Sequence, residues 1–297
     1  MKRALKWIGI VLAGIIVLLL LAGATLYALS ARKLSAKHEL PAERELVIAS
    51  DSATVSLGAK LVNSIPCGEC HGADLGGRVF ADAGPFGVLA GPNLTRGRGG
   101  REPPLSDIEL ERAMRHGVRR DGTSLLIMPS EVFTHVADNE MAAMIAYLKQ
   151  VPPVDREVLP TKLRIVGRFL LGAGQLPLAV DTTPRIPHVA SVDTTPTAEY
   201  GDYLARVSGC EGCHGAALSG GPGFTPSDPP VSNITPTGIG KWTEADFVRA
   251  MREGVRPGGT KISEQMPWKF FANRTDGELH AIWLYLRSVP PKQFQEP

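Results

Sequence analysis

The chain carries little net charge, and this shortage excludes one class of partner. Its 32 basic and 30 acidic residues give a formal charge of +2 at pH 7. The first 29 residues contribute Lys2, Arg3 and Lys6 and no acid, so the remainder holds 29 basic and 30 acidic residues. Binding to nucleic acid depends on a clear positive excess. The sequence therefore predicts no nucleic-acid partner.

Cysteine is also scarce: the 297 residues contain only four, and all four belong to one repeated pattern. The pattern reads "PCGECHG" at 66–72 and "GCEGCHG" at 209–215. Two disulfides would leave the histidine after each pair unexplained. A zinc ribbon places its pairs roughly 15–20 residues apart, whereas Cys70 and Cys210 are 140 positions apart. A thioredoxin-like motif would account for one pair, but not for two copies that both end in histidine.

The remaining interpretation is covalent haem attachment by Cys-x-x-Cys-His. The two thiols bond the vinyl-derived carbons at the porphyrin edge, and the next residue offers an imidazole nitrogen to the iron. We therefore predict two covalently bound c-type haems. The predicted attachment residues are Cys67, Cys70 and His71 at the first site and Cys210, Cys213 and His214 at the second.

Matching segments follow both motifs in the same order, which predicts a domain duplication. "LERAMRHGVRRDGT" (110–123) matches "FVRAMREGVRPGGT" (247–260), and both copies continue to a Met-Pro pair and a "YL-x-x-VPP" ending. We expect an all-α fold of two tandem domains behind an N-terminal helix. The expected segments are an anchor at 1–32, domains at 50–153 and 198–297, and a linker at 154–197.

Local signals predict the helices of each domain. Helices over 57–65 and 200–208 lead into the attachment sites, and Gly58 and Gly201 each stand nine residues before the first cysteine, which favours a close helix crossing. Capping boxes are expected at "LSDIE" and "WTEAD", with helix ends at the next glycine. The Gly- and Pro-rich segment after each attachment site is expected to be loop.

Met128 and Met266 are the candidates for the sixth iron ligand. Each precedes a proline, which disfavours helical geometry, so each is expected on an extended loop. Met114, Met251, Met141 and Met144 lie within helical patterns and are interpreted as core. The five histidines outside the motifs have no histidine at the equivalent position of the other half, so a structural or surface role is expected for them.

One long apolar run, Trp7–Leu29, has 23 residues without a charge, which is enough to cross a bilayer. A cleaved signal peptide is the alternative, although its apolar region is usually shorter. Haem attachment outside the cytoplasmic membrane would place the domains on the periplasmic or outer side of a single-pass bacterial membrane protein. In the linker, "KLRIVGRFLLG" predicts a short helix that either docks between the domains or lies on the membrane surface.

These motifs resemble class I cytochrome c domains, and in particular the cytochrome c subunits of membrane-bound alcohol and gluconate dehydrogenases. The resemblance rests on "CEGCHG", "SNITPTGIGKWTEADFVRAMREGV" and "QMPW" in the second half and on "CGECHG", "GPNLT" and "IMPS" in the first. It implies His/Met ligation of both irons and a non-catalytic relay of single electrons. The implied partner is a dehydrogenase, or by analogy of layout a haem-copper oxidase. The alternative is a two-haem enzyme, a peroxidase or a sulfur-compound dehydrogenase.

Overall fold

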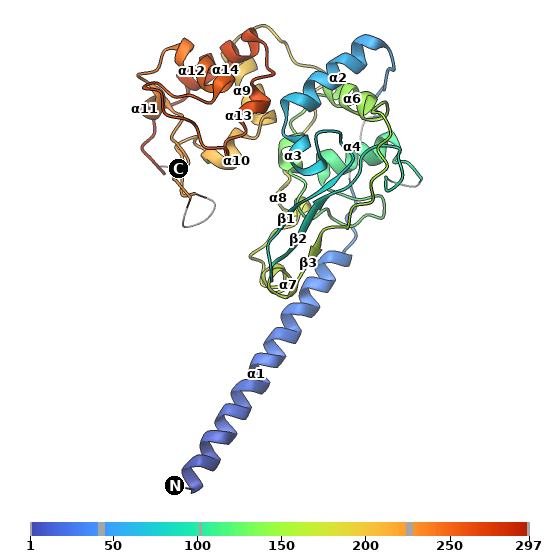
Figure 1. Cartoon of the computed structure of the whole chain (residues 1–297), viewed down its shortest axis with the longest axis vertical. Helices are drawn as coiled ribbons and strands as arrows, with labels where there is room; N and C mark the ends of the chain where they lie inside the picture. Colours follow the sequence, from blue (N-terminus) through green and yellow to red (C-terminus); the bar gives the residue numbers. More distant parts are fainter. Residues whose placement is uncertain (1, 41–44, 101–102, 224–227, 296–297) are drawn as a thin grey trace.

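The computed structural model describes residues 2–40, 45–100, 103–223 and 228–295. A long N-terminal helix, α1 (Lys2–Ser35), extends away from two packed lobes (Figure 1). We call helices α2 to α8 with their strands the first lobe, and helices α9 to α14 the second lobe. The helix α1 is long and apolar enough to cross a membrane, and the apolar window that meets this test is not buried against the rest of the protein.

The first lobe is built on helices whose ends are set by local hydrogen bonds. It contains α2 (Ser52–Ser64), α3 (Cys67–His71), α4 (Asp107–His116), α5 (Ser130–Phe133) and α6 (Asp138–Leu148). Ser106 and Glu109 form the expected capping box at the start of α4, and Gly117 ends that helix in the left-handed conformation, at φ 64°. Apolar side chains of α2, α4 and α6 form the core of this lobe.

The second lobe repeats this order of helices. It contains α9 (Ala198–Val207), α10 (Cys210–His214), α11 (Pro236–Ile239), α12 (Glu244–Glu253), α13 (Trp268–Phe271) and α14 (Asp276–Ser288). Thr243 and Asp246 form the capping box of α12, and Gly254 ends it with φ 67°. Both predicted capping boxes and both predicted glycine ends are therefore present.

The first helix of each lobe crosses the last one at a glycine. A Cβ atom on Gly58 would lie 1.9 Å from the carbonyl oxygen of Ala143, and one on Gly201 would lie 1.9 Å from that of Ala281. No side chain fits at that distance, so only glycine allows α2 to approach α6, and α9 to approach α14, this closely. The predicted close crossing is present in both lobes.

A small sheet corrects the all-α expectation. Strands β1 (Arg78–Asp82) and β2 (Gly87–Gly91) form an antiparallel hairpin in the segment expected to be loop, and β3 (Lys162–Leu163) from the linker pairs with β2. The hairpin strands are only five residues long and lie among glycines and prolines, so their alternating pattern is weak. The chain is thus mostly helical rather than all-α.

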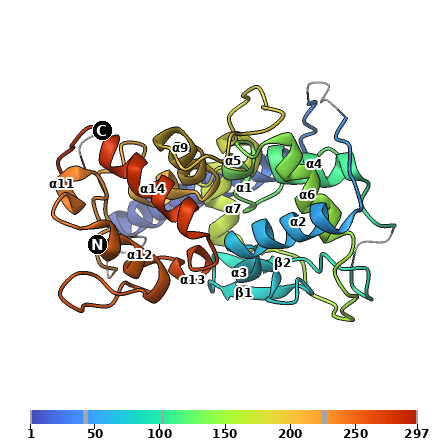
Figure 2. The same ribbon diagram turned by 90° about the horizontal axis from the view of Figure 1, so that it is seen from above.

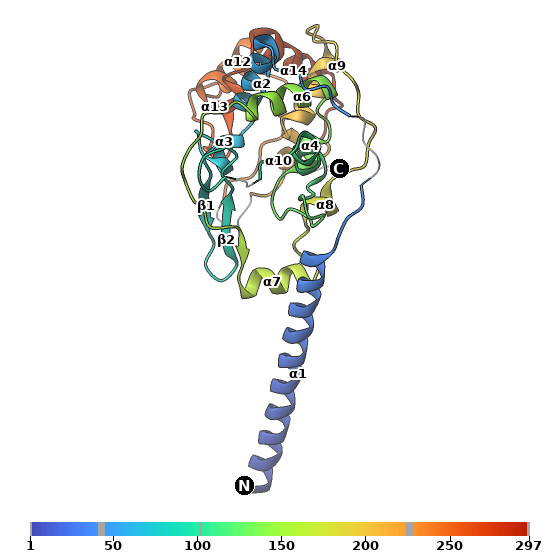
Figure 3. The same ribbon diagram turned by 90° about the vertical axis from the view of Figure 1, so that its right-hand side faces the viewer.

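The linker helix α7 (Ile165–Gly172) rules out one of the two alternatives expected for this segment. It does not dock between the lobes but lies across α1 at the base of the first lobe (Figure 3). A Cβ on Gly172 would lie 2.1 Å from the Leu26 carbonyl oxygen of α1. Leu171 is fully buried on the other side, with Leu163 and Leu178, and the short helix α8 (Ala179–Thr182) follows.

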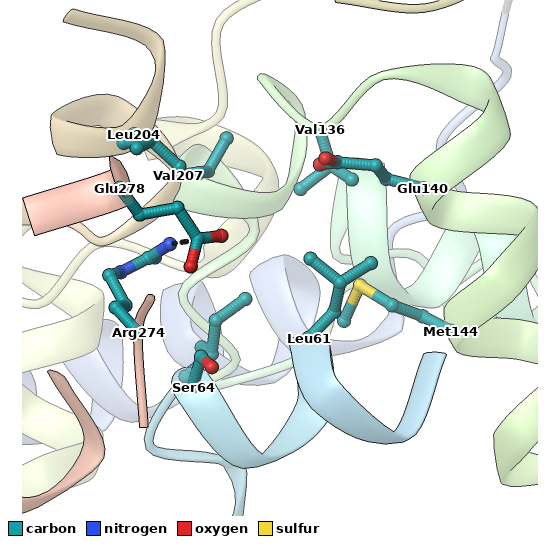
Figure 4. A pocket seen from close by; sticks show the side chains of 10 residues that line it. Leu61, Ser64, Val136, Glu140, Met144, Leu204, Val207, Arg274 and Glu278 are labelled. Carbon is teal, nitrogen blue, oxygen red and sulfur yellow. Dashed lines mark ion pairs between the residues drawn. The ribbon is translucent and has the colours of Figure 1, made fainter. Parts of the chain in front are cut away.

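The two lobes lie side by side, with α13 next to α2 (Figure 2). Lys60 of α2 pairs with Glu278 of α14 at 3.0 Å, and Val207 of α9 packs into the core of the first lobe. A cavity at this contact is lined by residues of α2, α6, α9 and α14, with Arg274 and Glu278 paired beside it (Figure 4). The interface therefore joins the helices that lead into Cys67 and Cys210.

Candidate functional site

Each Cys-x-x-Cys-His motif forms a single helical turn. The motifs are the five-residue helices α3 and α10, directly after the ends of α2 and α9. Cysteines three residues apart lie on the same face of such a turn. The preceding helix thus leads into a turn with both thiols on one side, and the histidine directly follows the second cysteine.

The four cysteines, all within the described ranges, form no disulfide with one another. Burial raises the pKa of Cys67 to about 12 and that of Cys210 to about 11, and it also raises the pKa of Cys70 and Cys213. Reactive dithiols depend on a lowered thiol pKa. Across the described ranges, no three His, Cys, Asp or Glu side chains converge in a metal-binding group. The geometry thus favours neither a dithiol redox centre nor a shared zinc site.

Both motif histidines use the same ring nitrogen in a hydrogen bond. Nδ1 of His71 lies 2.9 Å from the Pro92 carbonyl oxygen, and Nδ1 of His214 lies 2.8 Å from that of Ser232. A carbonyl only accepts, so Nδ1 carries the proton and Nε2 keeps its lone pair. Burial lowers the pKa of both histidines, although the bonds to the carbonyls oppose this effect. Each ring is therefore neutral and oriented, and its Nε2 lone pair is available to a metal ion, as in metal-ligating histidines.

An asparagine holds the segment that supplies each carbonyl. Asn93 accepts hydrogen bonds from the backbone and hydroxyl of Thr95, and its amide donates to the Val154 carbonyl at 2.7 Å. Asn233 does the same with Thr235 and with the Lys292 carbonyl, at 2.8 Å. The segments "PNLT" (92–95) and "SNIT" (232–235) follow the two attachment motifs in the sequence and share this asparagine. The feature that could have identified this asparagine is its shared position in the two halves, one residue after the carbonyl that bonds Nδ1 of the histidine.

The backbone around each histidine is also the same in both lobes. The carbonyl of His71 accepts from Gly77 at 2.7 Å, and that of His214 accepts from Gly220 at 2.9 Å. Leu75 and Leu218 both have φ 56°, a left-handed conformation that is uncommon outside glycine. Such strain persists only where the surroundings impose it. The two turns are therefore built to one pattern.

The candidate methionines lie on equivalent loops. Met128 and Met266 are half-buried, and their carbonyls accept from Ser130 and Trp268 at 2.8 Å. Met128 and Cys67 pack against the same apolar cluster of the first lobe. Cys210 packs against the cluster of the second lobe, but Met266 is not among the described residues that do so. Met114, Met141 and Met144 are buried core residues and Met251 packs at the core edge, as expected.

Two histidines outside the motifs meet inside the first lobe. The rings of His116 and His188 are 5.8 Å apart, and Nη1 of Arg115 lies 2.8 Å from Nδ1 of His188. Arg115 is fully buried and pairs with Glu111 at 3.1 Å and Asp138 at 2.8 Å. These side chains form a structural network, consistent with the role expected for the histidines. No pattern in the sequence indicates that His188 of the linker packs against His116.

The donor set in each lobe fits a covalently bound haem. Two thiols share one face of a helical turn, the imidazole after them presents Nε2, and a thioether lies half-buried on the loop before α5 or α13. The residues that would hold the haem of the first lobe are Cys67, Cys70, His71 and Met128. The equivalent residues of the second lobe are Cys210, Cys213, His214 and Met266.

Comparisons with known proteins relate the chain to cytochromes c. Residues 55–152 match the family described as cytochrome c. The chain is 30% identical to the cytochrome c subunit of a quinone alcohol dehydrogenase of Gluconacetobacter polyoxogenes, over 82% of this chain and 57% of that subunit. It is 25% identical to the fructose dehydrogenase cytochrome subunit of Gluconobacter japonicus, over 80% of this chain and 53% of that protein.

A shorter relative matches over most of both chains. The diheme cytochrome c-type protein of Cereibacter sphaeroides is 27% identical, over 79% of this chain and 86% of that protein. By contrast, the chain spans a little over half the length of the dehydrogenase subunits. Residues 55–152 form a cytochrome c domain, and the chain is a relative of the cytochrome c subunits of quinone alcohol and fructose dehydrogenases.

Proposed function

We propose that the chain relays single electrons through two covalently attached c-type haems, one in each lobe. The observation that carries the proposal is the imidazole–carbonyl hydrogen bond after both Cys-x-x-Cys turns, at 2.9 and 2.8 Å. We further propose that the lobes are two copies of one cytochrome c domain, at residues 50–153 and 198–297, joined by the linker at 154–197. The matched glycine crossings and asparagine hydrogen bonds support this duplication.

The proposed ligands favour a carrier over an enzyme. A haem held by these residues would accept and release one electron at a time. His71 with Met128, and His214 with Met266, would occupy both axial positions, and a thioether ligand favours the reduced state. A peroxidase needs one open or displaceable axial position, whereas both lobes place a half-buried methionine on the equivalent loop. The function is therefore electron transfer rather than substrate chemistry.

The relatives favour a dehydrogenase as the electron donor. Two of them are named as cytochrome subunits of alcohol and fructose dehydrogenases. None of the relatives reported above is named as part of a haem-copper oxidase, so that expectation gains no support. We propose that a membrane-associated dehydrogenase passes electrons to this chain and that a second redox protein accepts them.

Membrane attachment through α1 completes the proposal. The helix has a mean hydropathy of 2.7 over its most apolar window, and that window is fully exposed. Water-exposed apolar surface of this length is unfavourable, whereas a bilayer would cover it. We propose a single-pass anchor that holds both lobes on the periplasmic or outer side, where haem attachment takes place.

Haem counting on the full-length protein tests the proposal. Acid-acetone extraction should leave the haem with the polypeptide, and a pyridine haemochrome assay should give two haems per chain. The variant His214→Ala should keep covalent haem but lose the low-spin signal of one site, and His71→Ala should do the same at the other. One haem per chain, or haem that is removed by acid acetone, would contradict the proposal.

A further inference from the structure

The linker helix α7 has three faces, of which two are occupied. Arg168, Phe169 and Gly172 face α1: the Arg168 guanidinium lies 4.4 Å from the centre of the Tyr27 ring, and a Cβ on Gly23 would lie 3.4 Å from the Phe169 ring. Gly167 and Leu171 face the lobe, because Gly167 packs on the Phe86 carbonyl and Leu171 is fully buried. Residues four apart share a helix face. Val166 and Leu170 therefore form a third row, turned from both contacts.

This third face is apolar and open. Val166 keeps 40% of its surface exposed, and Leu170 is half-buried. The face carries no charge, since Arg168 lies over Tyr27 and Arg164 pairs with Asp82 at 2.6 Å. The helix α1, whose apolar side chains are mostly exposed, contacts α7 next to this face, where a Cβ on Gly23 would lie 3.4 Å from the Phe169 ring. The open face is thus attached to the apolar surface of the anchor.

The depth in the bilayer of the contact between α7 and α1 decides what covers the open face of α7. Gly23, Leu26 and Tyr27 of α1 touch α7, and all three lie within the uncharged run that ends at Leu29. At a rise of 1.5 Å per residue, Gly23 lies about 9 Å below Leu29. Interfacial helices bury their apolar faces about 5–10 Å into the boundary between headgroups and acyl chains. If α1 crosses the bilayer, α7 is held at this depth.

We propose that α7 lies in the outer boundary of the bilayer, with Val166 and Leu170 among the lipid acyl chains. Figure 3 shows α7 at the base of the first lobe, across α1. Tyr27 lies where aromatic side chains gather at membrane interfaces, and the Arg168 stem can extend along apolar surface with its charged head towards the headgroups. Two crossed helices would fix the height and tilt of the lobes above the membrane, which a single helix does not. The inference rests on the proposed membrane crossing of α1.

Photo-cross-linking of the full-length protein in vesicles of phosphatidylethanolamine and phosphatidylglycerol tests the inference. The photoreactive residue p-benzoylphenylalanine is placed at Val166 in one variant and at Leu170 in a second. Leu19 of α1, which is 66% exposed, is the positive control, and Val47, which is 88% exposed and precedes α2, is the matched negative control. Haem content is measured on every variant, so that only folded protein is compared.

Mass spectrometry of the illuminated samples should find lipid adducts at positions 166, 170 and 19, at least tenfold above position 47. Adducts at 19 with positions 166 and 170 at the level of 47 would overturn the inference while leaving the anchor in place. Adducts of 166 or 170 to a second copy of the chain would overturn it as well. A lack of adducts at 19 would instead refute the membrane crossing of α1, on which the inference rests.

Discussion

Tyr203 of α9 donates a hydrogen bond of 2.5 Å to the carboxylate of Glu140 of α6, across the contact between the two lobes. The same hydroxyl oxygen accepts from the backbone N–H of Ala137 at 3.1 Å. Burial raises the pKa of Glu140, and the bond from Tyr203 partly opposes this rise. The lobe interface therefore holds an acid whose ionisation is linked to the stability of the contact.

The first prediction is a loss of stability with rising pH that depends on Glu140. The ordinary pKa of glutamate is about 4.3, so above that pH the folded state retains a proton that the unfolded state has lost. The free energy of unfolding should therefore fall as pH rises from about 4.3 through the raised pKa. Buried histidines such as His214, whose pKa burial lowers, contribute the opposite slope below about pH 6.5. The contribution of Glu140 is therefore measured as the difference in thermal unfolding between the unmodified protein and Glu140→Gln from about pH 4.5 to 8.

Three variants test its origin. Glu140→Gln should remove the contribution of Glu140 to the slope, whereas the exposed control Glu264→Gln should keep it. Tyr203→Phe should extend the slope to higher pH, because the hydrogen bond that lowers the pKa of Glu140 is lost, and it should cost about 1–3 kcal/mol by leaving the Ala137 N–H unpaired. Glu278 does not confuse the test. Burial raises the pKa of Glu278, but its hydrogen bonds to Thr275 and Lys60 outweigh burial, so the pKa is lowered overall. The stabilisation that Glu278 contributes is therefore lost only as the pH falls below about 4.3. An unchanged slope in Glu140→Gln would refute the assignment.

The second prediction concerns the methionines Met128 and Met266. Replacing either by alanine should open one iron to added carbon monoxide, remove the weak sulfur-to-iron absorption band of that site and lower its potential. Covalent attachment should persist, because the cysteines are unchanged. Met251→Ala is the matched control, since Met251 packs at the core edge and should affect stability without opening a site. Rapid binding of carbon monoxide by the unmodified protein would point to an open iron and to the enzymatic alternative.

The third prediction is that alanine is not tolerated at the helix crossings. Within a helix, Gly→Ala normally gains about 1 kcal/mol. At Gly58 and Gly201 the added Cβ would meet a carbonyl oxygen at 1.9 Å, so overpacking should reverse the sign and cost about 1–3 kcal/mol or more. The melting temperature should fall in Gly58→Ala and Gly201→Ala but not in Gly221→Ala, where a Cβ would meet nothing within 4 Å. Equal melting temperatures for all three would show that the crossings are looser than the structure has them.

The fourth prediction assigns an electrostatic role to Arg274. This buried arginine donates to the hydroxyl of Ser208 at 2.8 Å, two residues before Cys210. Burial raises the pKa of the Cys210 thiol and the charge of Arg274 opposes the rise, so the charge acts at the second site. Positive charge favours a reduced, less positive iron.

A redox titration should separate the two sites in the Arg274 variants. Arg274→Gln should lower the potential of the second haem and leave that of the first nearly unchanged, whereas Arg274→Lys should retain much of the native value. Equal shifts of both haems, or a shift in Arg274→Lys as large as in Arg274→Gln, would contradict a local charge effect.

The sequence by itself determined the features that depend on neighbours within one helical turn. The two Cys-x-x-Cys-His turns, the capping boxes at Ser106 and Thr243 and the glycine ends of α4 and α12 all lie where local bonding requires them. The repeat made further predictions possible, because a residue that stands at the same place in both halves of the chain is rarely there by chance. The close crossings at Gly58 and Gly201 were predicted in this way.

Only the tertiary structure decided the contacts between distant segments. Strand β3 pairs with β2 across about 70 intervening residues, and α7 lies on α1 rather than between the lobes. Arg115 is fully buried between Glu111 and Asp138, although arginine is usually an exposed residue. These outcomes depend on which surfaces meet when the chain is compact, because burial and ion pairing are set by the partner rather than by local sequence preference.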